Sequence, residues 1–210
     1  MLKAGLTGSI AVGKSYVLEI LRELGAVTLD ADLTAREVVG AETEGLRLIV
    51  NEFGAGVLLP NGELDRAKMG AIVFADEAKR QLLNSIVHPL VHEAQGKWLK
   101  ERESENPNGI AVIDAALMIE SGGYKRFNCL IVVFCEPEIQ LQRLMSRNNL
   151  SETEALRRIN SQMPQDEKKK YADFLIDTSN GFEDTRRQTT EVFENLKLLL
   201  NENEFPIEHK

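Results

Sequence analysis

The sequence contains few of the residues that mark disulfide-rich or metal-binding proteins. Its 210 residues include only two cysteines, Cys129 and Cys135, which have no CxxC spacing and no histidine cluster nearby. Both lie in or beside the apolar run LIVVF. We therefore expect buried thiols in a reducing compartment, and neither a redox centre nor a thiolate metal site.

Long hydrophobic runs are also missing. No stretch approaches the length needed to cross a membrane, and the N-terminus has no charged segment followed by a long apolar one. These absences argue against a membrane protein and favour a cytoplasmic location.

Positive charge is in deficit, with 25 Lys and Arg residues against 33 Asp and Glu residues and a formal net charge of −8. General nucleic-acid binding needs a basic face that releases counterions from phosphates, so we do not expect a nucleic-acid partner. Any anionic ligand must be held by local positive groups. The chain is nevertheless 43% hydrophobic, enough to bury the core of one globular domain with small insertions.

The most informative stretch covers residues 2–15, LKAGLTGSIAVGKS, in which Gly8 is followed after four positions by Gly13, Lys14 and Ser15. This is the GxxxxGK(S/T) phosphate-binding loop. Such a loop turns backbone N–H groups toward a polyphosphate, and glycines are needed where a Cβ would block that approach. We expect Lys14 to reach the outer phosphates and the Ser15 hydroxyl to bind Mg²⁺.

The residues on either side of this loop fit a strand before it and a helix after it. The apolar residues before the loop are Leu2, Ala4 and Leu6, and those after it, at helical spacing, are Val17, Leu18, Leu21 and Leu24. The alternative is a Gly-rich turn that merely precedes Lys-Ser. Because strand, loop and helix are what the chemistry requires, phosphate binding is the better interpretation.

A second expected strand, residues 26–30, ends in Asp30, and Asp32 follows two residues later. The carboxyl ends of strands carry the ligand site in α/β sheets, so we expect these carboxylates near the phosphate loop. Asp32 could accept a proton from an attacking hydroxyl or hold Mg²⁺ through water. It could equally only cap the helix that begins near Leu33, and spacing alone leaves both interpretations open.

Residues 33–105 have a helical pattern, with helices expected at 34–39, 45–53, 64–74 and 77–87 and another that Pro89 opens. This region reads as an insertion between strands two and three that forms a wall of the site and could bind the second substrate. His88 either faces a ligand or is a structural hydrogen-bonding group near a helix start. Arg36 and Arg66 are either surface charges or anion contacts.

Three further strands are expected at 110–114, 130–134 and 172–177, and a long helix at 182–200 precedes an acidic tail at 201–210. Asp114, at the end of the third strand, stands where phosphoryl-transfer proteins often keep a carboxylate for Mg²⁺ or its waters. Asn180, in the loop after the last strand, can reach a nucleotide base.

Basic residues gather after the fourth strand. Arg143 and Arg147 share one helix face, Ser151 and Glu154 form a capping-box pattern, and residues 168–170 are all lysine. One interpretation is a lid whose cations close over a transferring phosphoryl group and exclude water. The other is a solvated helix with Glu/Arg pairs.

Together these pieces resemble the dephospho-coenzyme A kinase family, which is similar to the nucleoside monophosphate kinases. The matching stretches are GLTGSIAVGKS, LDADLTAR, LDRAKMGAIVF, IVHPLV, IDAALMIES, QLQRLMSR and FLIDTSNG. They occur in the family's order and cover nearly the whole chain, so the match is far more specific than the phosphate loop alone.

The resemblance implies an enzyme that uses ATP and Mg²⁺ to phosphorylate the ribose 3′-hydroxyl of dephospho-CoA, in the last step of coenzyme A synthesis. It implies Asp32 as the general base and Arg143 as a lid arginine on the transferring phosphates, with Arg147 beside it. His88 and Pro89 would belong to the acceptor-side wall, and Asn180 to the adenine environment. The implied ATP phosphate site is residues 8–16, including Gly8, Ala11, Val12, Gly13, Lys14, Ser15 and Tyr16.

The chain departs from the family's usual pattern in two places. The family loop usually reads GGIGSGKST, whereas Ser9, Ala11, Val12 and Tyr16 stand here. Backbone N–H donors survive these changes, so we expect ATP binding to persist, although Tyr16 removes a possible second hydroxyl near the metal. Ala116 replaces the proline of the family's PLLFE motif, which concerns only the local loop shape.

The sequence thus predicts an α/β fold with a parallel five-stranded sheet as its P-loop NTPase core. A helical acceptor-binding insertion at about 33–105 and a lid at about 143–171 would belong to one domain, residues 1–210, acting as a monomer on small molecules. Another small-molecule kinase, for a nucleoside monophosphate or a sugar, is the alternative enzyme. A GTPase-like switch would need a guanine-reading NKxD element, which the sequence lacks.

Overall fold

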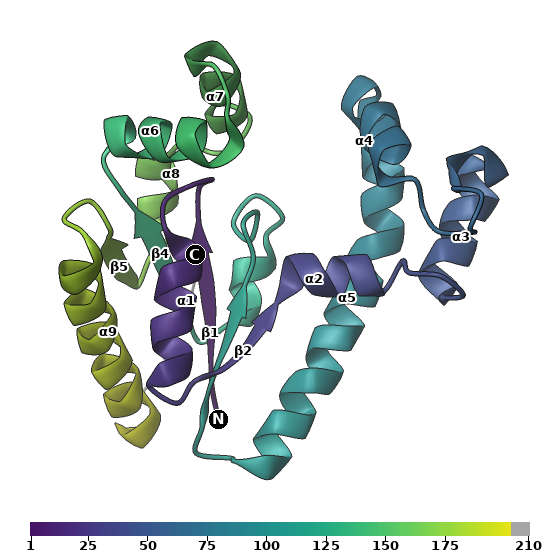
Figure 1. Ribbon diagram of the computed structural model, residues 1–210. Coiled ribbons are helices and arrows are strands. Elements are labelled where there is room, and N and C mark those ends of the chain that lie inside the picture. Colours follow the sequence, from purple (N-terminus) through teal and green to yellow (C-terminus); the bar gives the residue numbers. More distant parts are fainter. Residues whose placement is uncertain (203–210) are drawn as a thin grey trace. The chain divides into compact units, whose positions relative to one another are not determined.

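Five strands form a single sheet in the computed structural model, which describes residues 1–202 (Figure 1). They are β1 (Leu2–Gly8), β2 (Val27–Asp30), β3 (Ile110–Asp114), β4 (Cys129–Phe134) and β5 (Phe174–Asp177). Their order across the sheet is β2-β3-β1-β4-β5, and β1 pairs in parallel with both β3 and β4. The predicted parallel five-stranded α/β core is confirmed. The acidic tail expected at 201–210 lies outside the described residues from position 203 onward.

The strand order brings distant parts of the chain to one edge of the sheet. Because β1, β3 and β4 run in parallel, Gly8, Asp114 and Phe134 all end their strands at the same carboxyl edge. Ligand sites in open α/β sheets form at this edge. The phosphate loop that follows β1 therefore begins beside the end of β3, as the sequence predicted for Asp114.

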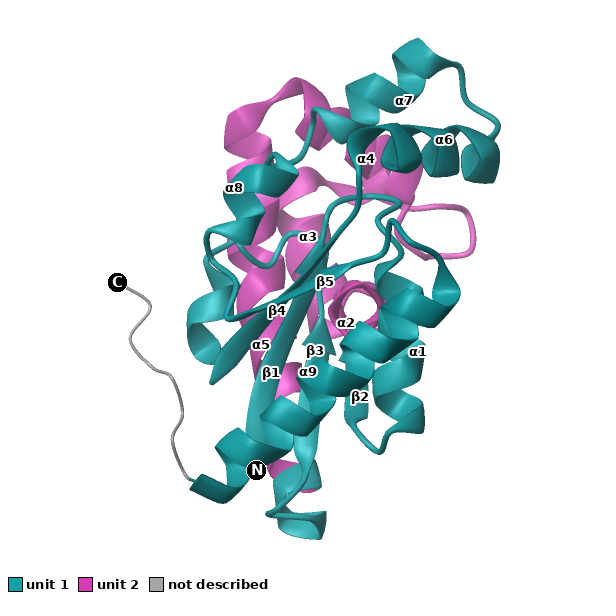
Figure 2. Ribbon diagram, turned by 90° about the vertical axis from the view of Figure 1, so that its left-hand side faces the viewer, with its two compact units in different colours: residues 1–29, 102–210 teal, residues 30–101 magenta. Residues whose placement is uncertain are grey.

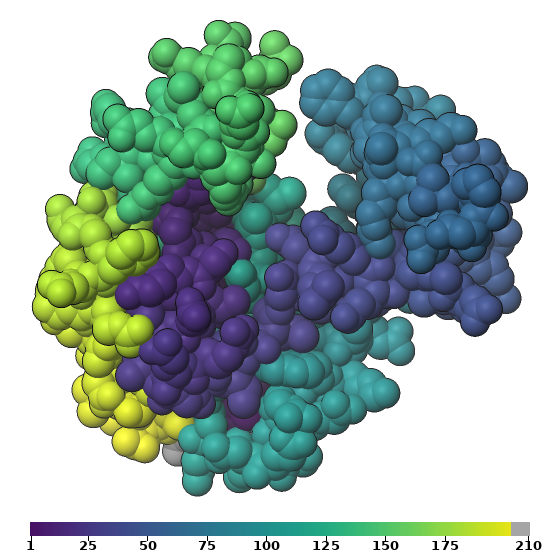
Figure 3. Space-filling model, viewed as in Figure 1, coloured from purple at the N-terminus to yellow at the C-terminus, as the bar shows by residue number. Residues whose placement is uncertain are grey.

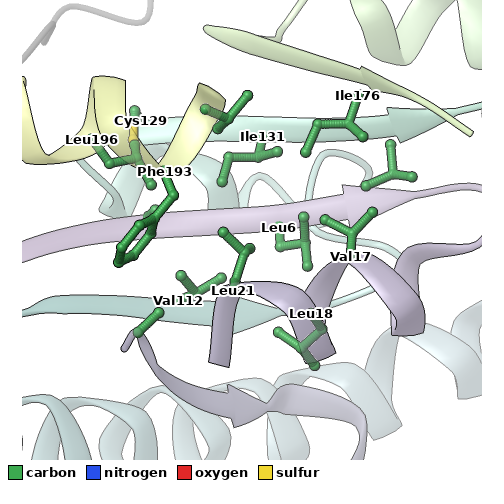
Figure 4. Packing of buried hydrophobic residues seen from close by; sticks show 14 of the residues in the cluster. Leu6, Val17, Leu18, Leu21, Val112, Cys129, Ile131, Ile176, Phe193 and Leu196 are labelled. Atoms are coloured by element: carbon green, nitrogen blue, oxygen red, sulfur yellow. The ribbon is translucent and has the colours of Figure 1, made fainter. Parts of the chain in front are cut away.

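The main core lies against two helices, α1 (Lys14–Glu23) and α9 (Phe182–Glu202), which Figure 3 shows packed side by side in purple and yellow. In Figure 4, Val17 and Leu21 of α1 and Phe193 of α9 point toward Leu6 and Ile131 of the sheet. Strand residues at alternate positions share a face, which is why the apolar run of β1 fills this core. Each such side chain contributes about 1.5–3 kcal/mol when fully buried.

Three helices separate β4 from β5 in the sequence: α6 (Pro137–Asn148), α7 (Glu152–Ile159) and α8 (Gln165–Lys169). A short 3₁₀ helix, η2 (Gly123–Arg126), stands between β3 and β4. The predicted capping box of α7 is confirmed. The Ser151 N–H donates to Glu154 Oε2 at 2.9 Å, and the Glu154 N–H donates to Ser151 Oγ at 3.4 Å.

The chain divides into two compact units, drawn in different colours in Figure 2. We call residues 1–29 with 102–202 the sheet unit, and residues 30–101 the helical unit. The helical unit contains α2 (Ala31–Glu37), α3 (Glu44–Phe53), the 3₁₀ helix η1 (Ala55–Val57), α4 (Arg66–Ala75) and most of α5 (Glu77–Glu105). It has its own small core, formed by Val39, Leu46, Ile49, Val57, Leu64 and Met69.

One prediction for this region is wrong. The sequence suggested a helix at 77–87 and a new one opened by Pro89, but α5 runs through Pro89 for 29 residues without a break. A proline inside a helix loses a hydrogen bond and costs about 3 kcal/mol. Burial on both sides of the proline offsets this, since Ile86 packs on the core of the helical unit and Val91 and Leu99 are buried. Neither α5 nor any other helix in residues 1–202 is long and apolar enough to cross a membrane.

Candidate active site

The phosphate-binding loop connects the end of β1 at Gly8 to the start of α1 at Lys14. A Cβ on Gly8 would lie 2.6 Å from the Val133 carbonyl oxygen, which no side chain tolerates. Gly13 adopts φ 89°, the left-handed region that favours glycine. Both glycines of the motif are thus required by the backbone, and the predicted strand, loop and helix are present in that order.

Ala11 is the residue of this loop whose conformation is unexpected. Its φ is 63°, so a residue with a Cβ occupies the left-handed region. For residues other than glycine this region costs roughly 1–2 kcal/mol. The family pattern that usually has glycine here explains the geometry, and the alanine of this chain is held in it by the surrounding structure.

Lys14 and Asp114 form an ion pair at the carboxyl edge of the sheet. Their side chains are only 16% and 8% exposed, so bulk water screens the pair weakly. Lys14 is the first residue of α1 and Asp114 the last of β3, which places the lysine beside the loop rather than in solvent. Lys14, which the sequence predicts to contact the phosphates, is therefore held at this edge of the sheet by Asp114.

Arg143 of α6 is anchored to the loop after β5. Its guanidinium donates from Nη1 to Thr178 Oγ1 and from Nη2 to the Thr178 carbonyl, both at 2.8 Å. The Thr178 hydroxyl in turn donates to the Val12 carbonyl at 2.7 Å. The structure thus links the predicted lid arginine to the phosphate loop through a threonine that the sequence analysis missed.

A cavity of about 160 Å³ opens next to this network. Its lining consists of Gly13, Tyr16, Arg143, Thr178, Gly181, Phe182 and Thr185. The Tyr16 and Phe182 rings meet edge to face at 4.9 Å, and the Tyr16 hydroxyl donates to the Phe182 carbonyl at 3.4 Å. Three predicted nucleotide residues, Gly13, Tyr16 and Arg143, are therefore brought together around one apolar and aromatic hollow.

Two other predicted nucleotide contacts do not line this cavity. Arg147 is exposed and donates from Nε to Asn148 Oδ1 at 2.9 Å. Asn180 donates from Nδ2 to Asp184 Oδ2 at 3.5 Å. Phe182, two residues after Asn180 and the first residue of α9, lines the cavity, although the sequence did not indicate it as a ligand contact.

In the helical unit, the two aspartates at the start of α2, Asp30 and Asp32, have different roles. The Asp30 side chain caps the helix by accepting from the N–H groups of Asp32 and Leu33, at 2.8 and 3.0 Å. The interpretation that Asp32 is the cap is therefore wrong, because its neighbour already fills that position. Asp32 lies in the first helical turn with an exposed side chain, where a carboxylate is favoured by the helix dipole.

The remaining acceptor candidates also belong to the helical unit. The Arg66 Nη2 donates to the Arg36 carbonyl at 3.1 Å, which joins α4 to α2, and both arginines are exposed. His88 and Pro89 are exposed within α5, so the expectation that His88 lies near a helix start is wrong. Its ring stacks on that of His92, one helical turn later, with centroids 6.3 Å apart.

Lys168 is buried, which bears on the two interpretations left open for residues 168–170. Its side chain is 1% exposed and forms an ion pair with Glu120 at 2.9 Å, while also donating to the Ala116 carbonyl at 2.9 Å. The solvated alternative is therefore wrong for this lysine, although Lys170 is exposed. The family usually has proline at position 116. The backbone carbonyl of Ala116 accepts the hydrogen bond from Lys168.

The two cysteines are buried free thiols, as predicted. Burial, together with the Asp173 carboxylate, raises the pKa of Cys129 from 9.0 to about 12. Burial also raises the pKa of Cys135, although Arg143 and Thr178 oppose this. Neither thiol is therefore a reactive group of the site.

Among residues 1–202, no cluster of three or more His, Cys, Asp or Glu side chains is arranged to hold a metal ion. Mg²⁺ in phosphoryl-transfer sites usually keeps several waters and takes only one or two protein ligands besides phosphates. The exposed Ser15 in the first turn of α1 and the Asp114 carboxylate beside Lys14 are oxygen donors of this kind.

Comparison with known proteins points to one family. The family model described as dephospho-CoA kinase matches residues 2–184 of the chain. A dephospho-CoA kinase from Listeria innocua is 46% identical over 192 residues, covering 90% of this chain and 94% of that protein. The match therefore includes the phosphate loop, the helical unit and the loop after β5.

Two solved structures are similar to the chain over almost its whole length. The Thermus thermophilus protein TT1252 has a TM-score of 0.78 and 29% identity, covering 93% of this chain and 97% of its own. The dephospho-CoA kinase from Campylobacter jejuni has a TM-score of 0.70 and 29% identity, again covering 93% and 97%.

Proposed function

The chain belongs to the dephospho-CoA kinase family, and from this we propose that it transfers the γ-phosphoryl group of ATP to the ribose 3′-hydroxyl of dephospho-CoA. The products are coenzyme A and ADP, so the reaction is the last step of coenzyme A biosynthesis. The observation that carries the proposal is the glycine loop between β1 and α1 with Lys14 held beside it by Asp114.

Nucleotide binding is assigned to the loop and to α1. The loop N–H groups and the helix N-terminus receive the phosphates, and Lys14 moves from Asp114 to the outer phosphate oxygens. Mg²⁺ neutralises charge on the β- and γ-phosphates when it is bound with ATP. Ser15 and Asp114 are the residues that would hold the ion or its waters.

The transfer step requires a base and a cation. The 3′-oxygen forms a bond to the γ-phosphorus, the bond from that phosphorus to the β,γ-bridging oxygen breaks, and the hydroxyl proton goes to Asp32. Arg143 uses two of its five N–H donors on Thr178, so others remain for oxygens of the transferring group. Its positive charge there stabilises the transition state.

Further contacts are assigned on the same basis. Tyr16 and Phe182 offer ring surface to the nucleotide base. Asn180, two residues before Phe182, and Arg147, one helical turn after Arg143, are assigned to the same side of the site. On the acceptor side, Arg36, Arg66, His88 and Pro89 are proposed to contact dephospho-CoA, whose phosphates the two arginines can pair with. A cytoplasmic location and a monomeric state stay predictions.

A coupled ADP-release assay with and without dephospho-CoA tests the proposal. We expect ADP release to depend on both dephospho-CoA and Mg²⁺. Mass spectrometry should show a product that is heavier than dephospho-CoA by one phosphoryl group. An acceptor lacking the 3′-hydroxyl is the matched control and should give only background release.

Two results would contradict the proposal. One is ADP release at the same rate with and without dephospho-CoA. The other is a higher kcat/KM with a nucleoside monophosphate or a sugar as acceptor, which would assign the chain to another class of small-molecule kinase.

A further inference from the structure

The peptide groups of Ile10 in the phosphate loop are held from both sides by glutamine side chains far away in the sequence. The Ile10 N–H donates to Gln162 Oε1 at 2.7 Å. The Ile10 carbonyl accepts from Gln140 Nε2 at 2.8 Å. Neither glutamine belongs to the loop motif, and both come from the segment between β4 and β5.

The hydrogen bonds around Gln140 fix the orientation of its side-chain amide. Its side chain is 2% exposed, and its Oε1 accepts from Gln165 Nε2 at 2.8 Å. Gln165 Oε1 in turn accepts from the Cys135 N–H at 3.0 Å. Because the Gln140 oxygen is already committed, its amide nitrogen must face Ile10, and the chain of bonds has a single direction.

Gln162 is placed by the loop between α7 and α8, which is itself attached to the core. The neighbouring Met163 N–H donates to Glu120 Oε1 at 3.2 Å, and Glu120 pairs with the buried Lys168. The Met163 carbonyl accepts from Ser9 Oγ at 3.5 Å. Residues 9 and 10 of the phosphate loop are thus bonded to two consecutive residues of this connection.

The residue after Ile10 is Ala11, with its left-handed φ of 63°. Strained backbone of this kind persists only where the surrounding structure over-determines it. Bonds to both the N–H and the carbonyl of the preceding residue, Ile10, supply such a constraint.

We propose that Gln140 and Gln162 are positioning residues for nucleotide binding: they hold the loop in the conformation that turns its N–H groups toward the phosphates. The proposal rests on the proposed use of ATP, because it concerns how this chain prepares its loop for a polyphosphate. It assigns a function to two side chains that touch the loop and not the ligand.

The test replaces each glutamine by methionine, which keeps the length and removes the hydrogen bonds. Gln142→Met is the matched control, because Gln142 is exposed on the same helix as Gln140. ADP binding is measured by calorimetry, and kcat, KM for ATP and KM for dephospho-CoA by the coupled assay. Urea unfolding confirms that each variant is folded.

We expect Gln140→Met and Gln162→Met each to weaken ADP binding and raise KM for ATP about five- to tenfold, the loss of one hydrogen bond. The KM for dephospho-CoA should stay unchanged, as should every value for Gln142→Met. Gln162 is half-buried and its variant should fold even if Gln140→Met does not.

A second substitution separates positioning from packing. Glycine adopts left-handed φ without the steric penalty of alanine. Ala11→Gly added to Gln162→Met should therefore recover at least about half of the lost ADP affinity on a logarithmic scale, whereas a merely structural glutamine would show no recovery.

ADP binding by Gln162→Met within about twofold of the parent would overturn the proposal, as would a failure of Ala11→Gly to restore any affinity. Because ADP binding does not need the acceptor, the inference and the proposed function fail separately. A chain that releases no ADP with dephospho-CoA could still show the loss and its recovery.

Discussion

The two units of this chain hold their functional groups in opposite ways. In the sheet unit, the charged groups beside the phosphate loop are paired where water has little access, as Lys14 is with Asp114. In the helical unit, the candidates for the acceptor side lie on exposed surface: Asp32, Arg36, Arg66, His88 and Pro89. A site made of backbone groups and buried ion pairs forms as the chain folds, so substitutions there also affect stability. Exposed side chains can be substituted with little effect on stability.

The cores of the units differ in the same direction. The main core joins residues of four strands to α1 and α9, and many of them, such as Leu6 and Ile131, are fully buried. The core cluster of the helical unit consists of six buried residues, Ile49 among them, with partly exposed side chains packed on them. The free energy of unfolding increases with the apolar surface that is buried. We therefore expect substitutions in the sheet unit to lower mainly the stability, and substitutions in the helical unit to lower mainly the turnover.

The largest expected effect comes from Asp32→Asn in the helical unit. Removal of a general base lowers kcat by about 10²- to 10⁴-fold, while ADP affinity and the urea midpoint should stay close to those of the parent. Steady-state kinetics with dephospho-CoA, calorimetry and urea unfolding measure the three quantities.

Asp30→Asn is the matched control, because asparagine caps a helix as well as aspartate does. It should leave kcat nearly unchanged. Equal turnover by Asp32→Asn and the parent would remove Asp32 from the role of base, and an equal loss in both variants would attribute the effect to the fold of α2.

Next in size is Lys168→Met in the sheet unit. The substitution leaves Glu120 and the Ala116 carbonyl without their cation, and breaking a buried ion pair in this way costs about 3 kcal/mol. Urea unfolding should show this loss, with Lys170→Met, an exposed lysine, unchanged. If the two variants unfold at the same urea concentration, burial of the Lys168 pair adds nothing to stability.

A smaller effect is expected from the Cys129 thiol as pH rises. The unfolded chain releases this proton above about pH 9, whereas the folded chain keeps it until about 12, so the thiol's contribution to stability is complete below about 9 and is lost above it. The decline is at most about 1.4 kcal/mol per pH unit. Urea unfolding at about pH 8 and pH 10 measures it.

Cys129→Ala should flatten this decline while lowering stability by about 1 kcal/mol at neutral pH, because a small cavity replaces the sulfur. Cys135, whose pKa burial also raises, contributes to the slope that remains. An identical pH dependence in the variant and the parent would mean that Cys129 ionises equally in both states.

The smallest effect is expected from Ala11→Gly alone. Relief of the left-handed alanine gains roughly 1–2 kcal/mol, and the greater freedom of glycine in the unfolded chain removes about 0.4–1 kcal/mol. A net gain of about 0.5 kcal/mol should appear in urea unfolding. Ala11→Ser keeps a Cβ and should show no gain in stability. A gain as large as that of Ala11→Gly would contradict the interpretation that the left-handed φ of Ala11 is strained.

Much of the fold could be predicted because its signals are local. Burial on both faces makes β4 a continuous apolar run, β1 has apolar residues at alternate positions, and the capping box at Ser151 needs only residues three apart. The prediction at Pro89 is wrong for the opposite reason. Whether a proline ends a helix depends on how the helical turns on either side of it are packed. Here Ile86, in the turn before Pro89, packs on a core that other helices form.

The amino-acid sequence alone determined the phosphate loop. Its conformation depends on backbone geometry that a few neighbouring residues set, namely Gly8, Gly13 and Lys14. Only the tertiary structure decided which side chains support it. Asp114 lies 100 residues from Lys14 and Gln162 lies 152 from Ile10, and strand order and the α7–α8 connection bring them together. The physical reason is that a hydrogen bond or ion pair depends on distance in space, and no local pattern carries the distance between residues so far apart in the chain.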